Sequence, residues 1–258
     1  MDYVEFIGKM VKIKEMGYVP SHREGDTGIG KTLEDLLGIA ENNISGPDFS
    51  NYELKAARKN SVSMLTLFTK APQPANANKE LLEKCGYPSR KQILHSSLRD
   101  SSQNKLTDYT PRIYSTNSAE KAEDKELHIT VDALSWNSCK LKLSVRADRL
   151  YIDNDKNVEA YYDNETLKDC FEKKYHTLIY ILADHKGTRN NESFWFNEGY
   201  LLDGFSFQRF SELIAEGKLK VDIRIGHYKD GRLHDHGTGF RILPKYLPQC
   251  FKTINKIL

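Results

Sequence analysis

The sequence lacks several features that would assign it to a class at once. No stretch is apolar and long enough to span a membrane, and residues 1–19 alternate charged with apolar residues, unlike a secretory signal. The four cysteines are widely scattered, without the spacing of a zinc finger or a disulfide framework. These absences predict a protein of the reducing cytoplasm. The formal net charge is only +2, so charge alone does not demand a nucleic-acid partner.

What is present indicates a mixed α/β protein with a substantial core. The chain has 258 residues, 39% of them hydrophobic and 29% charged, which is enough for one large domain or two joined lobes. Hydrophobic periodicity predicts helices over residues 1–17, 31–38 and 205–215. Strands are predicted over residues 52–56, 62–69, 127–133, 139–146, 178–183, 193–196 and 219–225. Loops are predicted over residues 71–78 and 96–126.

The first chemically informative pattern is an aspartate followed by a Glu-x-Lys triplet. Side chains alternate along a strand, so Glu53 and Lys55 share one face, and Asp48 lies a short turn before them. Two carboxylates in one cleft suit Mg²⁺, which polarises a phosphate and activates a bound water. A neighbouring lysine stabilises the charge that develops during phosphodiester hydrolysis. The pattern therefore predicts metal-dependent phosphodiester chemistry.

The same pattern has a plainer interpretation. An acid-x-Lys triplet with an upstream aspartate is common by chance, and alternating Glu and Lys also occur on solvated strand faces. The surroundings favour the functional interpretation, because a Gly46-Pro47 turn leads directly into the strand. The preceding helix also offers a third acid, Glu34.

A second pattern competes with the first. Residues 25–32 fit the phosphate-binding loop G-x-x-x-x-G-K-[ST], and residues 178–184 form an apolar strand that ends in an acid, as in a nucleotide-hydrolysing enzyme. However, such a loop must follow a buried strand, and residues 18–24 are polar and interrupted by Pro20. The alternative interpretation is a glycine-rich turn at the start of a helix, where backbone N–H groups and Lys31 contact a DNA phosphate.

A third pattern predicts a β-hairpin over residues 219–242. Val221, Ile223 and Ile225 alternate with Asp222 and Arg224, and Asp230-Gly231 is a strong turn signal. A two-stranded ribbon fits the major groove of DNA, where Arg pairs with guanine and Asp accepts from cytosine. The returning strand adds the candidate DNA contacts His234, His236 and Arg241. Two alternatives remain: Asp222 and Arg224 pair with each other, or the His-Asp-His run binds a metal.

Taken together, these segments resemble the MvaI/BcnI family of type II restriction endonucleases and, more distantly, the MutH mismatch-repair nickase. The resemblance spans most of the chain in order and is weakest over residues 71–218. It is carried by residues 25–37, 47–49, 53–55, 65–70, 221–226 and 234–242.

The resemblance implies a PD-(D/E)xK nuclease fold, with a central mixed sheet flanked by helices. It implies a catalytic lobe over residues 1–95 and a DNA-recognition lobe over residues 96–258 that contains the 219–242 hairpin, with interleaving of the two lobes as the alternative. Asp48 and Glu53 would then hold Mg²⁺ and Lys55 would be the catalytic lysine, with Glu34 and Lys70 as further candidates. Residues Asp222, Arg224, His234, His236 and Arg241 would contact double-stranded DNA.

The resemblance also implies how such an enzyme works. Members act as monomers that cut one strand and then the other at a short CC-x-GG site, in prokaryotes that protect their own sites with a cognate DNA methyltransferase. Arg241 favours an A·T central pair, which makes the expected site CCWGG. The alternatives are a MutH-like nickase, a nucleotide hydrolase that uses residues 25–32, and a DNA-binding protein without catalysis.

Overall fold

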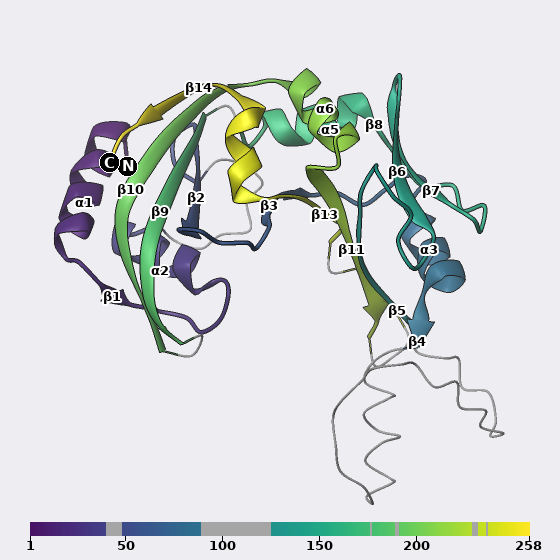
Figure 1. Cartoon of the computed structure of the whole chain (residues 1–258), viewed down its shortest axis with the longest axis horizontal. Coiled ribbons are helices and arrows are strands. Elements are labelled where there is room, and N and C mark those ends of the chain that lie inside the picture. The colour runs from purple at the N-terminus through teal and green to yellow at the C-terminus, as the bar shows by residue number, and fades with distance from the viewer. Residues whose placement is uncertain (40–47, 89–124, 176, 189–190, 229–231, 236) are drawn as a thin grey trace, which may run out of the picture.

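Three β-sheets and the helices packed on them form the described part of the chain (Figure 1). The structure is a computed structural model that describes residues 1–39, 48–88, 125–175, 177–188, 191–228, 232–235 and 237–258. Figure 1 shows one sheet with two helices at the left and the other two sheets at the right. No helix in the described ranges is long and apolar enough to cross a membrane.

The first sheet is mixed, as the sequence predicts. Strand β2 runs parallel to β9, whereas the other neighbours are antiparallel. The strand order is β1 (Val19–Pro20), β10 (Asn191–Phe205), β9 (Thr177–Thr188) and β2 (Tyr52–Arg58), and β14 (Phe251–Lys256) pairs with β10.

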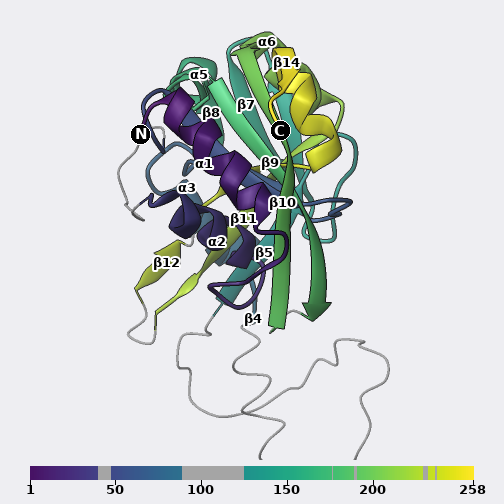
Figure 2. The ribbon, with the colours of Figure 1, turned by 90° about the vertical axis from the view of Figure 1, so that its left-hand side faces the viewer.

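Two helices bury one face of this sheet. They are α1 (Tyr3–Glu15) and α2 (Gly28–Leu37), and Figure 2 shows α1 lying across the long strands. Phe6 from α1 and Leu33 from α2 are fully buried against strand residues that include Ile179 and Phe194. Burial of these apolar side chains is what holds the helices to the sheet.

The second sheet carries the predicted hairpin. Its strand order is β3 (Leu65–Thr69), β13 (Gly239–Ile242), β11 (Leu219–His227), β5 (Lys125–Val131) and β4 (Tyr87–Pro88), with β12 (Leu233–Asp235) paired to β11. Val221, Ile223 and Ile225 are fully buried on one face, as their alternation predicts.

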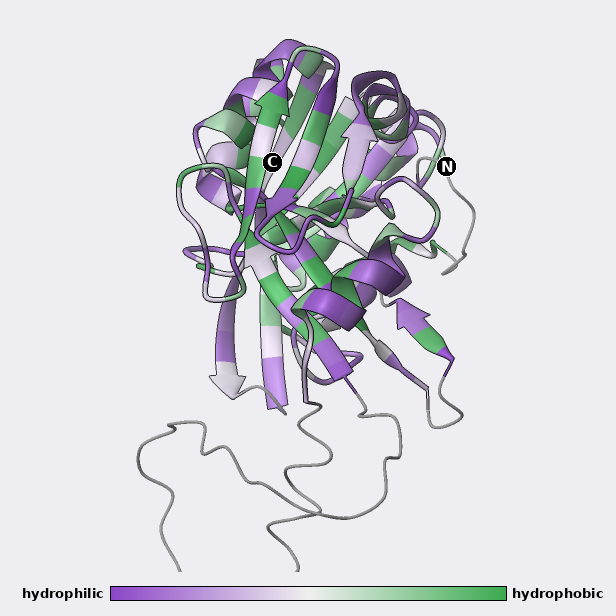
Figure 3. Cartoon of the chain, turned by 90° about the vertical axis from the view of Figure 1, so that its right-hand side faces the viewer, coloured by the Kyte–Doolittle hydropathy of each residue, from purple (hydrophilic) through white to green (hydrophobic). Residues whose placement is uncertain are grey.

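A third, three-stranded sheet packs into the same core as the second. Its strands are β6 (Leu141–Arg146), β7 (Arg149–Asn154) and β8 (Tyr161–Asp163). The helical elements of this part of the molecule are α3 (Ala77–Cys85), α5 (Asn164–Glu172), α6 (Phe207–Ala215) and the 3-10 helix η1 (Pro244–Cys250). Figure 3 shows hydrophilic and hydrophobic residues alternating along several of these strands.

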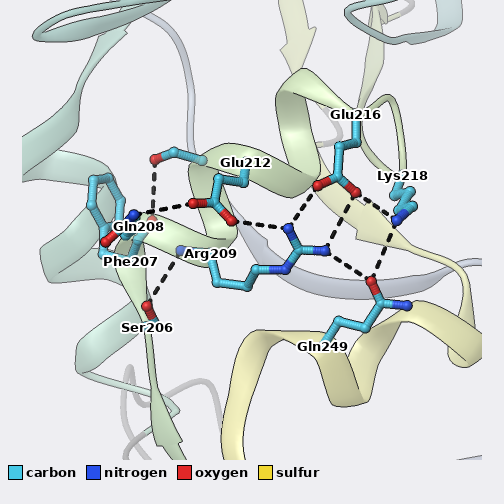
Figure 4. A network of polar contacts seen from close by, with 9 residues as sticks. Ser206, Phe207, Gln208, Arg209, Glu212, Glu216, Lys218 and Gln249 are labelled. Atoms are coloured by element: carbon cyan, nitrogen blue, oxygen red, sulfur yellow. Dashed lines mark hydrogen bonds and ion pairs between the residues drawn. The ribbon is translucent and has the colours of Figure 1, made fainter.

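A polar network ties α6 to η1 (Figure 4). The Arg209 guanidinium donates to Glu212, Glu216 and Gln249, with a shortest distance of 2.6 Å to Glu216 Oε1. Hydrogen bonds from Arg209 and then Lys218 lower the pKa of Glu216 to about 2. The network is exposed, so solvent screens it, and the buried face of α6 supplies the main attachment.

The sheets do not follow the expected division of the chain into lobes. Strands β9 and β10, expected in the recognition lobe, complete the sheet that contains β2. Strand β3, expected in the catalytic lobe, pairs with β13 of the hairpin instead. A boundary between residues 95 and 96 therefore does not separate the sheets.

Several elements extend or correct the sequence predictions. Helix α3 begins at Ala77, inside a predicted loop, and α5, β7 and β8 lie in a region where the sequence predicted nothing regular. Most of the predicted loop over residues 96–126 lies outside the described residues, and its last two residues begin β5.

The two glycines at the start of α2, Gly28 and Gly30, differ in how closely they are packed. A Cβ at Gly28 would overlap the carbonyl oxygen of Arg23 and the hydroxyl of Ser21, whereas a Cβ at Gly30 would meet nothing within 4 Å. Only the first of these glycines is therefore required by packing. In a phosphate-binding loop, by contrast, the glycine at position 30 lets the backbone approach a phosphate.

This difference gives a stability test with an internal control. Gly28→Ala should lower the free energy of unfolding by about 1–3 kcal/mol, because the new methyl group overpacks the turn. Gly30→Ala should leave it unchanged or raise it by up to about 1 kcal/mol, because alanine is the better helix former. Urea unfolding of both variants measures the difference. Equal destabilisation would contradict the packing described for Gly28.

Candidate active site and DNA-recognition face

A tight turn brings Asp48 back onto strand β2. Phe49 and Tyr52 exchange backbone hydrogen bonds of 3.3 and 2.9 Å across Ser50 and Asn51, and Ser50 has a positive φ of 49°. The Asp48 Oδ2 atom then accepts a 2.7 Å hydrogen bond from the backbone N–H of Leu54. The turn therefore places the carboxylate beside the strand that carries Glu53 and Lys55.

Aromatic packing fixes this turn. Phe49 is 8% exposed, and its ring lies 5.1 Å from that of Phe6 and 5.5 Å from that of Tyr52. Tyr3 stacks on Tyr52 at 5.5 Å. Because Tyr3 and Phe6 belong to α1, the first helix holds the turn that presents Asp48.

Glu53 and Lys55 share a strand face, as the sequence predicts. Tyr52, Leu54 and Ala56 pack toward the α1 and α2 side, and alternation directs Glu53 and Lys55 to the other side. The Glu53 side chain is 1% exposed, and its Oε1 atom lies 2.6 Å from Lys55 Nζ. Its Oε2 atom is buried without a hydrogen-bond partner among the described residues. A buried carboxylate of this kind needs cations to stay charged.

Two residues that the sequence did not single out complete the site. Lys174 Nζ lies 3.6 Å from Glu53 Oε1, so a second ammonium faces the same carboxylate. Tyr175 is fully buried and donates a 2.5 Å hydrogen bond to the Leu67 carbonyl. Burial, followed by the charges of Glu53 and Asp48, raises the pKa of Tyr175 well above its usual value.

The structure does not bring every candidate into this cluster. Glu34 is half-buried on α2, a helix that packs on the face of the sheet that carries Leu54. Lys70 follows β3 in the second sheet, where its N–H donates a 2.9 Å hydrogen bond to Thr238 O.

The phosphate-loop residues are engaged with one another. Lys31 Nζ pairs with Asp35 Oδ1 at 2.8 Å. The Thr32 hydroxyl is fully buried, where it accepts from His22 N at 2.9 Å and donates to Gly28 O at 2.8 Å. The strand before the run, β1, is two residues long and lies at the edge of the first sheet. This arrangement contradicts the nucleotide-binding interpretation.

The charged residues of the hairpin form a linked set on the second sheet. Asp222 Oδ2 lies 3.1 Å from Arg241 Nη1 and 3.5 Å from Arg224 Nε. Thr130 donates to Asp222 Oδ1 at 3.2 Å, and Arg241 Nε donates to the Thr66 hydroxyl at 3.0 Å. Asp222 thus pairs with both arginines, whose side chains stay 37% and 29% exposed.

The histidine part of the hairpin is described only in part. His234 lies on β12, and its ring stacks on that of Tyr228 with centroids 4.0 Å apart. His236 lies outside the described residues. No group of three or more His, Cys, Asp or Glu side chains suited to a metal occurs in the described ranges. Of the residues that the structure covers, the hairpin therefore offers no built metal site.

Comparison with known proteins identifies the family of the chain. The model of the MvaI/BcnI restriction endonuclease family matches residues 7–251. The chain belongs to the MvaI/BcnI restriction endonuclease family. It is thus a type II site-specific DNA endonuclease with a restriction-endonuclease fold. Restriction endonucleases of this kind generally use divalent metal ions.

Two solved structures are similar over the full length of the chain. One is the complex of restriction endonuclease MvaI with its cognate DNA substrate, at 27% identity and a TM-score of 0.76, covering 100% of both chains. The other is MvaI in the absence of DNA, at 27% identity and a TM-score of 0.56, covering 100% of this chain and 99% of that one. No curated protein sequence matches the chain. The sequence identity is the same for both structures, but the TM-score is higher for MvaI bound to DNA than for MvaI without DNA.

The buried carboxylate gives a prediction about stability that is separate from catalysis. Without metal, Lys55→Met should lower the free energy of unfolding by about 1–3 kcal/mol, because the Glu53 charge loses its nearest cation. Adding Glu53→Gln should recover part of this loss, since an amide needs no counter-charge. Urea unfolding in EDTA of the wild type, both single variants and the double variant measures the coupling. Additive effects within about 0.5 kcal/mol would show that the two side chains do not interact.

Proposed function

We propose that this family member hydrolyses DNA phosphodiester bonds with Mg²⁺ at Asp48 and Glu53, assisted by Lys55. The observation that carries the proposal is the turn that folds Asp48 onto Leu54 N–H beside the buried Glu53–Lys55 pair. Asp48 and Glu53 supply the two carboxylates that metal-dependent phosphodiester hydrolysis requires, and Lys55 supplies the cation.

The donor set fits Mg²⁺. Both candidate ligands are hard carboxylate oxygens, and Glu53 Oε2 is a buried acceptor without a hydrogen-bond partner among the described residues. Mg²⁺ commonly binds through one or two carboxylates and completes its shell with water and phosphate oxygens, so two protein ligands suffice. When bound, the ion supplies Lewis-acid polarisation of the scissile phosphate and a more acidic water.

The protein's own cations have separate tasks in this proposal. Lys55 lies 2.6 Å from Glu53 and orients the attacking water or stabilises charge on the phosphate. Lys174 reaches the same carboxylate from the segment before β9, so it adds a second positive charge near the phosphate. Tyr175 remains a neutral hydroxyl and holds this segment to β3 through Leu67.

Sequence recognition is assigned to the polar face of the second sheet. Arg224 and Arg241 have partly exposed side chains beside Asp222, and Arg–guanine pairing in the major groove is the commonest specific contact. We assign His234 and His236 to the same task and Lys31 to a DNA phosphate. The proposed site is CC-x-GG, with CCWGG favoured by Arg241.

The remaining features of the proposal concern how the enzyme works in the cell. We propose a monomer that cuts the two strands in sequence, in a prokaryotic cytoplasm where a cognate methyltransferase protects the host sites. The TM-score to a DNA complex supports double-stranded DNA as the substrate. Glu34 and Lys70 remain further candidates for the catalytic lobe.

Cleavage of plasmid DNA tests the metal site. With Mg²⁺ and no ATP, the wild type should give double-strand breaks at one defined sequence, and EDTA should abolish them. Asp48→Asn should lower cleavage by at least about 100-fold, as loss of a transition-state electrostatic contact does. It should still bind cognate DNA in Ca²⁺. Asp148→Asn, at an exposed aspartate of the third sheet's turn, is the matched control and should cut normally.

The outcomes of this assay separate the alternatives. Cutting by Asp48→Asn at the wild-type rate would refute the assigned metal site. Nicks in one strand only, dependent on a partner protein, would indicate a MutH-like enzyme instead. ATP hydrolysis without cleavage would restore the nucleotide-binding interpretation.

Mapping the cut ends tests the recognition residues. Duplexes that carry CCAGG should be cut, and duplexes that carry CCCGG should not. Arg224→Met should reduce the preference for the cognate duplex, at about 1–3 kcal/mol for a lost bidentate contact. Equal preference before and after the change would exclude Arg224 as a base-reading residue.

A further inference from the structure

Strand β12, which carries His234, is the short returning strand of the hairpin and lies beside β11. It is three residues long and pairs with β11, through Ile225 to Asp235, Gly226 to His234 and His227 to Leu233. The Tyr228 ring stacks on His234, and Tyr228 N donates to Arg232 O at 2.8 Å. The position of such a short strand therefore depends on its side-chain contacts as well as on its backbone pairing with β11.

A side-chain hydrogen bond joins β12 to α3. Asn78 Nδ2 donates to Asp235 Oδ2 at 2.5 Å, and Gly237 N donates to Asp235 Oδ1 at 2.7 Å. Asn78 is 6% exposed, although its side chain is mostly a polar amide. Both oxygens of Asp235 are therefore engaged within the protein.

The surroundings make this hydrogen bond costly to lose. Asn78 Oδ1 is buried without a hydrogen-bond partner among the described residues, so the Nδ2 bond is the contact that offsets burial of the amide. Tyr162 is also buried, next to the Phe240 ring, and burial followed by the Asp235 charge raises its pKa. Asp235 itself is exposed, so the buried partner in this hydrogen bond is Asn78.

Asp235 lies directly after His234 on β12, so its contact with Asn78 affects how His234 is presented. Successive side chains on a strand point to opposite faces, so Asp235 anchors one side of β12 while His234 is presented on the other. A free carboxylate beside a base-reading histidine would also repel the DNA phosphates. The hydrogen bond from Asn78 directs the Asp235 carboxylate toward α3.

We propose that Asn78 and Asp235 form a positioning pair that sets the sequence specificity of the enzyme by fixing His234 against the DNA. Neither residue contacts a base in this proposal. The inference rests on the proposed function, because it requires β12 to face the recognition sequence. It adds a residue from α3, far from the hairpin in the sequence, to the set that determines specificity.

An exchange of the two side chains tests the pair. Asn78→Asp places two carboxylates together and should reduce the ratio of cognate to non-cognate DNA affinity by about tenfold or more, a loss typical of one specific base contact. The double variant Asn78→Asp with Asp235→Asn restores an amide–carboxylate hydrogen bond in reverse and should recover most of the ratio. Asn76→Asp is the control. It makes the same chemical change on the exposed start of α3, where Asn76 contacts Glu80, and should leave the ratio of cognate to non-cognate DNA affinity unchanged.

The measurement is equilibrium binding in Ca²⁺ to the duplex that the wild type cuts and to one with a changed base pair, with thermal unfolding recorded for every variant. If Asn78→Asp lowers the melting temperature but not the affinity ratio, or if the exchanged variant regains stability without specificity, the pair is only structural and the inference is wrong. If the wild type itself shows no preference between the duplexes, the proposed function fails instead.

Discussion

The parallel pairing of β2 with β9 is the constraint on which both parts of the molecule depend. Tyr52 pairs with Thr177 and Arg58 with Ala183, so the strand that carries Glu53 and Lys55 finds its partner only after a long insertion. That insertion, together with residues 206–250, builds the second and third sheets. Lys174 and Tyr175 lie where the chain returns, and for this reason they meet Glu53 and Leu67.

The local chemistry of the site was predictable, but its completion was not. Alternation along β2 placed Glu53 and Lys55 together, and the Gly-Pro turn suggested that Asp48 would join them. Lys174 carries no local signal, since its contact with Glu53 depends on the pairing of β2 with β9. The expected lobes are two segments that can interleave, and the long-range pairing of β2 with β9 is why the sheets interleave. Helix α5 is polar overall and buries only Leu167 and Phe171, so few apolar residues mark it as a helix in the sequence.

The glycine-rich run shows how one pattern suits two structures. Its lysine and threonine are the types that hold a nucleotide phosphate, yet here they stabilise the start of α2. Arg58 extends this arrangement, because its guanidinium donates to the carbonyls of Gly25 and Asp26 while it pairs with Glu192 at 2.5–2.6 Å. What distinguishes the two structures is the strand before the run and the burial of the threonine, neither of which a short motif records.

The interleaved sheets also determine when the nuclease becomes competent during its synthesis. A nascent chain that ends before residue 177 holds Asp48, Glu53 and Lys55, but β2 has no neighbour in its sheet. The second sheet is also incomplete at that stage. Strand β3 pairs with β13 and strand β5 pairs with β11, and both partners are synthesised later. A fragment released before residue 177 therefore lacks both the strand that pairs with β2 and the completed second sheet, so neither the proposed metal site nor the proposed recognition face is assembled.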